Sequence, residues 1–192
     1  MSWIAALWGP DAEALRATEP GWSRPALEDQ GPYASGTPFN LLVGGAGAAP
    51  TMDWSVLGQR VFAWTVEETA VINSGFGSPP EVTMVSLMRR NPAMDHAEFV
   101  AHWLDCHAPL AKRRHIGLTD YRQCVVTETL TLDTSEIATS EIDGVALLGF
   151  SSRHDFDTRF FDSDEGRAEI MADVARFMDR PGPETTLVGP PG

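Results

Sequence analysis

The sequence predicts an α+β fold in which two helices cover one face of an antiparallel sheet. The first observation is the segment EVTMVSLMRR (81–90), which reads as a strand with apolar residues on both faces. We therefore expect Val82, Val85 and Leu87 to be buried. The second observation is the order of patterns from residue 81 onward, which is strand, helix, strand, strand, helix, strand. This βαββαβ order is that of a ferredoxin-like unit.

Each element of this unit has a local signal. Asp95 and Glu98 have the spacing of a capping box at the start of the first helix. Alternating and β-branched residues predict strands over 119–132 and 143–152, and a helix is expected over 165–179. The short apolar run TTLVG then predicts a last strand.

The chain before residue 80 is less regular. The segment NSGFGSPP (73–80) is rich in Gly and Pro and marks a seam between two parts. We expect an accessory part at 1–75 and the main α+β domain at 81–192. Within the first part, SWIAALW and RVFAWTVEETAVI predict strands, DAEALRA and TMDWSVL predict short helical pieces, and residues 19–40 are expected to be loop.

Composition narrows the function to small-molecule chemistry. The chain has 14 Lys and Arg against 27 Asp and Glu, a formal net charge of -13. Such a surface repels phosphate backbones and anionic lipid, so neither nucleic acid nor membrane is an expected partner. The N-terminus lacks a basic signal-peptide region, and two cysteines are too few for a disulfide framework. We expect a cytoplasmic protein.

The segment EFVAHWLDCHAPLAKRRH (98–115) is the most informative helix. At 100° per residue a narrow stripe faces the sheet. The stripe comprises Phe99, Trp103, Cys106 and Leu110. His102 and His107 lie at its two edges. Pro109 lacks an N–H and disfavours helical geometry at Ala108, so the helix is expected to kink or end its first segment at His107.

Three segments contain residues of the kinds that bind a metal, a nucleotide or an anion, but a binding site is not the favoured interpretation of any of them. His102, Cys106 and His107 include metal-ligand types, but on an α-helix His107 points about 140° away from His102, and no second cluster completes four ligands. The loop LLVGGAGAAP (41–50) mimics a nucleotide loop but runs into Pro50, which predicts a turn. The run Lys112–His115 is typical of a solvated helix end, with an anion site as the alternative.

A set of residues in this helix and the next strand resembles a known family. Phe99, Trp103, the run His107-Ala108-Pro109-Leu110, Gly117-Leu118 and Tyr121 closely resemble the signature of EthD-like proteins, members of the dimeric α+β barrel superfamily. Further matches are Asp143-Gly144-Val145 and, near the end of the last helix, Asp173, Phe177 and Asp179. The resemblance covers residues 82–188. It implies a dimeric or pseudo-dimeric α+β barrel, with residues 1–75 as a shortened, divergent ferredoxin-like half, and it allows a homodimer.

The resemblance also implies a class of chemistry. Similar domains act as cofactor-free dehydratases or cyclases on polyketide-like aromatic compounds. We therefore expect a lyase-like enzyme for a small hydrophobic or aromatic carbonyl compound, with His107 as general base and Tyr121 donating to the developing enolate. The expected substrate-binding residues are Trp103, His102, Phe150 and Phe177. The alternatives are a cofactor-free monooxygenase of an aromatic substrate and a non-catalytic small-molecule carrier.

No cofactor is expected on this interpretation. Metal, haem and nucleotide are all predicted to be absent. Superfamily relatives bind haem through a single histidine. A haem bound through His102, His107 or His154 would therefore contradict this expectation. His154 otherwise has the sequence context of a surface residue near a helix N-terminus.

Overall fold

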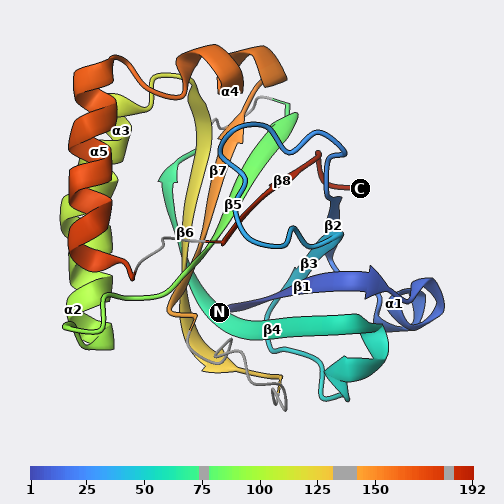
Figure 1. Cartoon of the computed structure of the whole chain (residues 1–192). Helices are drawn as coiled ribbons and strands as arrows, with labels where there is room; N and C mark the ends of the chain where they lie inside the picture. The colour runs from blue at the N-terminus through green and yellow to red at the C-terminus, as the bar shows by residue number, and fades with distance from the viewer. Residues whose placement is uncertain (74–77, 132–141, 180–183) are drawn as a thin grey trace.

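The computed structural model describes residues 1–73, 78–131, 142–179 and 184–192. Its centre is a single antiparallel sheet of eight strands in the order β2-β3-β1-β4-β6-β7-β5-β8. The longer helices form a layer against the outer face of the second half of this sheet (Figure 1). The α+β fold predicted from the sequence is confirmed.

The second half of the chain is the expected βαββαβ unit. Its strands are β5 (Val82–Met88), β6 (Leu118–Thr129), β7 (Gly144–Phe150) and β8 (Glu184–Val188). Between β5 and β6 lie α2 (His96–Ala101), η2 (His102–His107) and α3 (Ala108–Arg114). Between β7 and β8 lie α4 (Arg153–Arg159) and α5 (Asp164–Phe177).

Two local predictions for this unit are confirmed. Asp95 accepts a hydrogen bond from the Glu98 backbone while the Glu98 carboxylate accepts one from the Asp95 backbone, which is the capping box expected at the start of α2. Both faces of β5 are covered, because Val82, Val85 and Leu87 are 2%, 0% and 3% exposed.

The first half of the chain repeats this strand order on a smaller scale. Its strands are β1 (Ser2–Pro10), β2 (Trp22–Pro25), β3 (Leu41–Ala46) and β4 (Gly58–Ile72), with α1 (Ala12–Thr18) and the short 3-10 helix η1 (Trp54–Leu57). The order β2-β3-β1-β4 matches β6-β7-β5-β8. The division of the chain at 73–80 stays a prediction, and residues 74–77 of that seam lie outside the described residues.

Two expectations for this half need correction. Residues 19–40 were expected to be loop, but β2 pairs with β3 from Trp22 to Pro25. The segment 41–50 was expected to be a turn, but β3 runs through its first two glycines and the turn comes only at Gly47, where φ is +86°. Pairing with β1 and β2 on both sides holds β3 extended, so tertiary contacts override the turn signal of its glycines.

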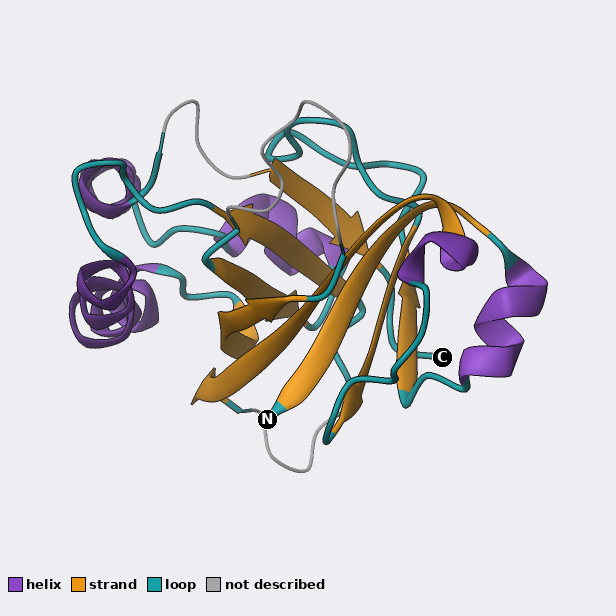
Figure 2. Ribbon diagram, turned by 90° about the horizontal axis from the view of Figure 1, so that it is seen from below, coloured by secondary structure: helices purple, strands orange, loops and turns teal. Residues whose placement is uncertain are grey.

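The sheet curls into a nearly closed barrel within one chain (Figure 2). Its first and last strands meet through the backbone, because the Leu27 amide donates to the Leu187 carbonyl at 2.9 Å and the Gly189 amide donates to the Pro25 carbonyl at 2.8 Å. The barrel therefore needs no second copy to complete its sheet. Among the described residues, no helix has both the length and the apolar character needed to cross a membrane.

The barrel has an apolar interior that is separate from the core beneath the helices. Side chains from both halves of the chain fill it, among them Ile4, Phe62, Trp64, Val85, Leu87, Cys124, Val145 and Leu147. The opposite faces of β5, β6 and β7 look outward and pack under the α2–α5 layer. Because the interior is filled with side chains, the candidate site is in the outer layer, between helices and sheet.

Candidate active site

The helix that carries the candidate histidines contains one π-helical segment. It spans His102–His107, and at its end the Ala108 amide donates to the carbonyl of Trp103, five residues back. The helix then continues directly as α3 with Pro109 as its second residue, and the missing N–H of Pro109 cannot donate to the carbonyl of Asp105. The predicted interruption at His107 thus takes the form of a change of helix type, and the helix does not end there.

The π segment rotates the buried face by one residue. Phe99, Trp103 and Leu110 are buried as expected, but Cys106 is exposed and His107 takes the inward position. Cys106 was expected on the buried stripe, but the spacing of 100° per residue behind that expectation holds only for an α-helix. A π-helix has more residues per turn, so the i, i+4 spacing from Phe99 through Trp103 leads to His107.

His102 and His107 converge on one carboxylate, which corrects the expectation that they diverge. His107 Nδ1 lies 2.9 Å from Asp173 Oδ2, and His102 Nε2 lies 2.9 Å from Asp173 Oδ1. Residues five apart lie close together on a π-helix, whereas on an α-helix they would lie about 140° apart. Burial opposes ionisation of Asp173, but the hydrogen bonds from His107 and His102 outweigh it and hold the pKa of this carboxyl below its ordinary value.

The Asp173 carboxylate fixes which nitrogen of His107 carries a proton. An ionised carboxylate only accepts hydrogen bonds, so Nδ1 of His107 must be the donor. In the neutral ring, Nε2 is then left with its lone pair. The ring of Phe177 packs against both imidazoles, with centroids 4.9 Å from His102 and 5.1 Å from His107. His107 is therefore held in one orientation and one tautomer.

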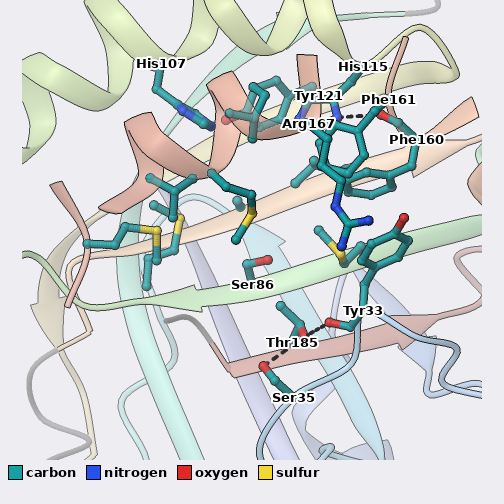
Figure 3. A pocket seen from close by; sticks show the side chains of 18 of the residues that line it. Tyr33, Ser35, Ser86, His107, His115, Tyr121, Phe160, Phe161, Arg167 and Thr185 are labelled. Atoms are coloured by element: carbon teal, nitrogen blue, oxygen red, sulfur yellow. Dashed lines mark hydrogen bonds between the residues drawn. The ribbon is translucent and has the colours of Figure 1, made fainter. Parts of the chain in front are cut away.

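His107 borders a cavity of about 270 Å³ that lies between the outer face of the sheet and the helices (Figure 3). Most of its wall is apolar and comes from β5, β7, α5 and the segment after α4. The apolar wall comprises Met84, Met88, Trp103, Ala146, Leu148, Phe160, Phe161, Ile170, Met171, Val174 and Met178. The polar lining is Tyr33, Ser35, Ser86, His107, His115, Tyr121, Arg167 and Thr185.

Tyr121 contributes a hydroxyl to the inner end of this cavity. Its oxygen accepts hydrogen bonds from Trp103 Nε1 at 3.2 Å and from Gln123 Nε2 at 3.0 Å. These two donors occupy both lone pairs, so the hydroxyl hydrogen is left to point elsewhere. Burial raises the pKa of Tyr121 to about 12, although the bonds from Gln123 and Trp103 act in the opposite direction. Tyr121 is therefore a protonated donor at neutral pH.

His115 is a lining residue that sequence reasoning missed. The run Lys112–His115 was interpreted as a solvated helix end, but its last member turns inward and is 4% exposed. Its Nδ1 lies 2.6 Å from the Phe160 carbonyl, which can only accept, so Nδ1 is the donor. Burial lowers the pKa of His115 to about 4, and its hydrogen bond to Phe160 only partly opposes this. His115 is neutral at pH 7.

The other predicted site residues take different places around the cavity. Trp103 lines it, whereas Phe177 lies behind the histidines and His102 lies on the far side of Asp173. Phe150 is also one layer back: its fully buried ring stacks on Phe160, 5.4 Å away, and does not reach the lining. His154 is exposed on α4.

The mouth of the cavity is formed by residues with no signal in the sequence. Tyr33, from the loop after β2, stacks on Phe160 with ring centroids 4.6 Å apart. Arg167 and Met171 lie one turn apart on α5, and both are exposed. Only the tertiary fold brings residue 33 against residues 160–171, so no spacing within either segment would have identified them.

The described part of the site offers little to a cofactor. Among the described residues, no group of three or more His, Cys, Asp or Glu side chains is arranged to hold a metal ion. The cavity of about 270 Å³ lies below the range of roughly 300–1,000 Å³ usual for drug-sized ligands, and a tetrapyrrole is larger than most of these. A haem therefore does not fit the cavity.

Comparisons with known proteins agree with this architecture. Residues 91–181 match the EthD domain family. An anthrone oxidase-like protein superposes with a TM-score of 0.57 and 9% identity, over 98% of this chain and 90% of that one. A mutant chlorite dismutase from Candidatus Nitrospira defluvii gives a TM-score of 0.51 and 11% identity, over 98% and 90%. No curated protein matches the sequence.

These identities are low, so the two structures show a shared fold, and the domain match shows a similarity over residues 91–181. The domain match begins just after β5 and includes the π segment, Tyr121 and Asp173. Residues 91–181 are therefore similar to the EthD domain family, and the whole chain shares the α+β barrel fold of the two solved structures.

Proposed function

We propose that this chain is an enzyme that moves protons on a small aromatic or polyketide-like carbonyl compound without a cofactor. One observation carries the proposal: a histidine whose tautomer is fixed by a carboxylate borders an apolar cavity, beside a tyrosine hydroxyl that has only its hydrogen left to give. The first group accepts a proton and the second stabilises the charge that forms.

His107 is the general base in this proposal. Asp173 holds Nδ1 protonated and stabilises the imidazolium that forms when Nε2 takes a proton. His107 is 8% exposed and lies beside a mostly apolar wall, which limits its solvation. Such positioned bases contribute about 10²- to 10⁴-fold to a rate.

Tyr121 supplies the matching electrostatic stabilisation. Removing a proton from the carbon next to a carbonyl moves negative charge onto the carbonyl oxygen, which becomes an enolate. A preorganised donor aimed at that oxygen lowers the barrier, since the donor need not reorganise as charge develops. The Trp103 and Gln123 N–H groups fix the Tyr121 oxygen, and its raised pKa keeps the proton on it.

A dehydration follows directly from these two groups. Nε2 of His107 removes the α-proton of a β-hydroxy carbonyl compound, the electron pair forms the enolate, and the enolate then expels the β-hydroxyl. The imidazolium returns its proton to the leaving oxygen, so that water and an unsaturated carbonyl compound are the products. A cyclisation by attack of the same enolate on a second carbonyl uses the same residues.

The predicted binding residues take distinct parts in this proposal. Trp103 forms a wall for the aromatic body of the substrate. His102 and Phe177 act as positioning residues, because they touch Asp173 and the His107 ring from the side away from the cavity. Phe150 supports the wall through its stack on Phe160.

A cofactor-free monooxygenase is the second candidate. Its first step would be removal of a proton from an electron-rich phenol, for which the same base and apolar wall are suited. The fold neighbour described as an anthrone oxidase-like protein favours this alternative over other oxidative chemistry. Consumption of dioxygen during turnover separates it from the lyase.

Hydrogen exchange tests the base function before the natural substrate is identified. The protein is incubated in D₂O with an aryl methyl ketone such as 2-acetylnaphthalene, and NMR follows loss of the α-hydrogens. We expect exchange with the native chain and with His154→Ala, whose histidine is exposed on α4. His107→Ala should bind the ketone but lose exchange. Binding without exchange in the native chain would instead identify a carrier.

A further inference from the structure

We infer that the ligand of this cavity carries a carboxylate on its apolar body, and that Arg167 binds this group at the mouth. This inference names the substrate class of the site in the proposed function and rests on that proposal.

The cavity differs in charge from the rest of the molecule. The chain has 27 Asp and Glu and a net charge of -13, yet none of the described residues that line the cavity is Asp or Glu. The lining instead includes Arg167, two histidines and the Tyr121 hydroxyl. Asp173 hydrogen-bonds His107 but is not a lining residue, and its two oxygens are engaged by His102 and His107. The cavity is thus a local exception on a surface that repels anions.

Arg167 has no anionic partner of its own among the described residues. Its neighbours on this side of the molecule do: Arg114 pairs with Asp162 and Glu169, and Arg159 pairs with Asp155. Ser163 and Met171, four residues away on either side, cannot form an ion pair, and Asp164, three residues before Arg167, forms none with it among the described residues. No described residue accepts a hydrogen bond from its guanidinium.

The orientation of Arg167 directs those donors to the cavity mouth. Figure 3 shows its side chain reaching from α5 towards Tyr33, with the guanidinium drawn between the helix and the Tyr33 ring. A guanidinium binds a carboxylate with two parallel hydrogen bonds, which gives orientation as well as affinity. A carboxylate at the mouth places the apolar body of the ligand along the methionines and aromatic rings, with its far end at His107 and Tyr121.

A matched pair of ligands tests the inference by calorimetry. The probes are 2-naphthoate and 2-naphthamide, which share size and aromatic body but differ in charge. We expect the native chain to bind naphthoate at least about tenfold more tightly, since hydrogen bonds to charged groups are worth roughly 1.5–3 kcal/mol. Arg167→Gln should remove this preference. Arg176→Gln, which changes an exposed arginine of the same helix outside the cavity lining, should keep it.

The outcomes separate this inference from the proposed function. Equal affinity for the two probes, binding of neither, a preference that survives Arg167→Gln or a preference that Arg176→Gln also removes would each overturn the assignment of Arg167. None of these results bears on the His107 exchange assay, which uses a neutral ketone. If the native chain did not exchange the α-hydrogens of the ketone but still preferred naphthoate, the proton-transfer function would be overturned. The cavity would then be a binding site for acids.

Discussion

Nδ1 of His107 and Oδ2 of Asp173 lie 2.9 Å apart, and this pair links the two helices that cover the sheet. His107 ends the π segment and Asp173 belongs to the last two turns of α5. The second oxygen of the same carboxylate meets His102, one π turn before His107. The contact therefore joins the helices and fixes the proton on the imidazole at the same time.

The first prediction concerns the Asp173 carboxylate. Asp173→Asn keeps the shape of the side chain but its amide lets Nδ1 of His107 lose the proton that the carboxylate fixed. We expect kcat, or the α-hydrogen exchange rate, to fall by about 10²- to 10⁴-fold while ligand affinity changes little. Asp164→Asn, in the exposed first turn of α5, is the control. A variant that loses affinity and rate equally would point to a purely structural role for Asp173.

The second prediction concerns the hydroxyl of Tyr121. Tyr121→Phe leaves the buried N–H groups of Trp103 and Gln123 without their acceptor, which should cost about 1–3 kcal/mol of unfolding free energy. Tyr33→Phe removes a hydroxyl from the cavity mouth and should cost much less unfolding free energy, as measured by urea unfolding.

The Tyr33→Phe protein also tests the ionisation of Tyr121, which is then its one remaining tyrosine. Tyr121 should show no tyrosinate absorbance at about pH 10, where an ordinary tyrosine is half ionised. Tyrosinate absorbance at that pH in a folded sample would contradict the buried donor.

The third prediction is a loss of stability in mild acid caused by His115. Burial lowers the pKa of its imidazole from 6.5 to about 4 in the folded chain. Between these two values the unfolded chain binds a proton that the folded chain does not, so stability falls as the pH falls. From pH 6.5 to 5 this should remove about 2 kcal/mol of unfolding free energy.

His115→Gln isolates that contribution. Glutamine can still donate to the Phe160 carbonyl but does not titrate, so the variant should lose less stability than the native chain over the same pH range. His154→Gln, at an exposed position, should behave as the native chain does. Urea unfolding at several pH values measures all three. Parallel pH profiles for the native chain and His115→Gln would show that the imidazole is not buried in its neutral form.

The parts of the fold that follow from local sequence were predicted well. The two-sided apolar pattern of 81–90 reports a strand covered on both faces, and the spacing of Asp95 and Glu98 reports a helix start, because each depends on neighbouring residues only. The strand β2 was missed because its four residues are held by pairing with β3, which local composition does not report. Closure of the barrel between Pro25 and Gly189 is likewise a contact between distant segments.

Only part of the candidate site could be predicted from the sequence, because the rest depends on tertiary structure. His107, Tyr121 and Trp103 were identified from a short helix and the strand after it, and all three line the cavity. The convergence of His102 and His107 was missed because a single π turn changes which residues share a face. Arg167 and Tyr33 were missed because their position depends on how α5 and the loop after β2 pack together.

The fourth prediction concerns Gly144 at the start of β7. A Cβ atom at this position would lie 2.5 Å from Cζ3 of Trp103, so the glycine makes room for the indole. Gly144→Ala must displace a fully buried ring, and overpacking of this kind typically costs about 1–3 kcal/mol. Moving the indole also pulls Nε1 from the Tyr121 oxygen, so turnover should fall more than the loss of folded protein explains.

Gly189→Ala is the matched control for this substitution. A Cβ atom there would meet its nearest neighbour, Cδ2 of Leu27, at 3.6 Å, which is ordinary van der Waals contact. We therefore expect little change in its unfolding free energy and none in activity, because Gly189 is not among the residues that line the cavity. If Gly144→Ala were as stable and as active as Gly189→Ala, the close packing of Trp103 against β7 would be wrong, and with it the fixed position of the Tyr121 hydroxyl.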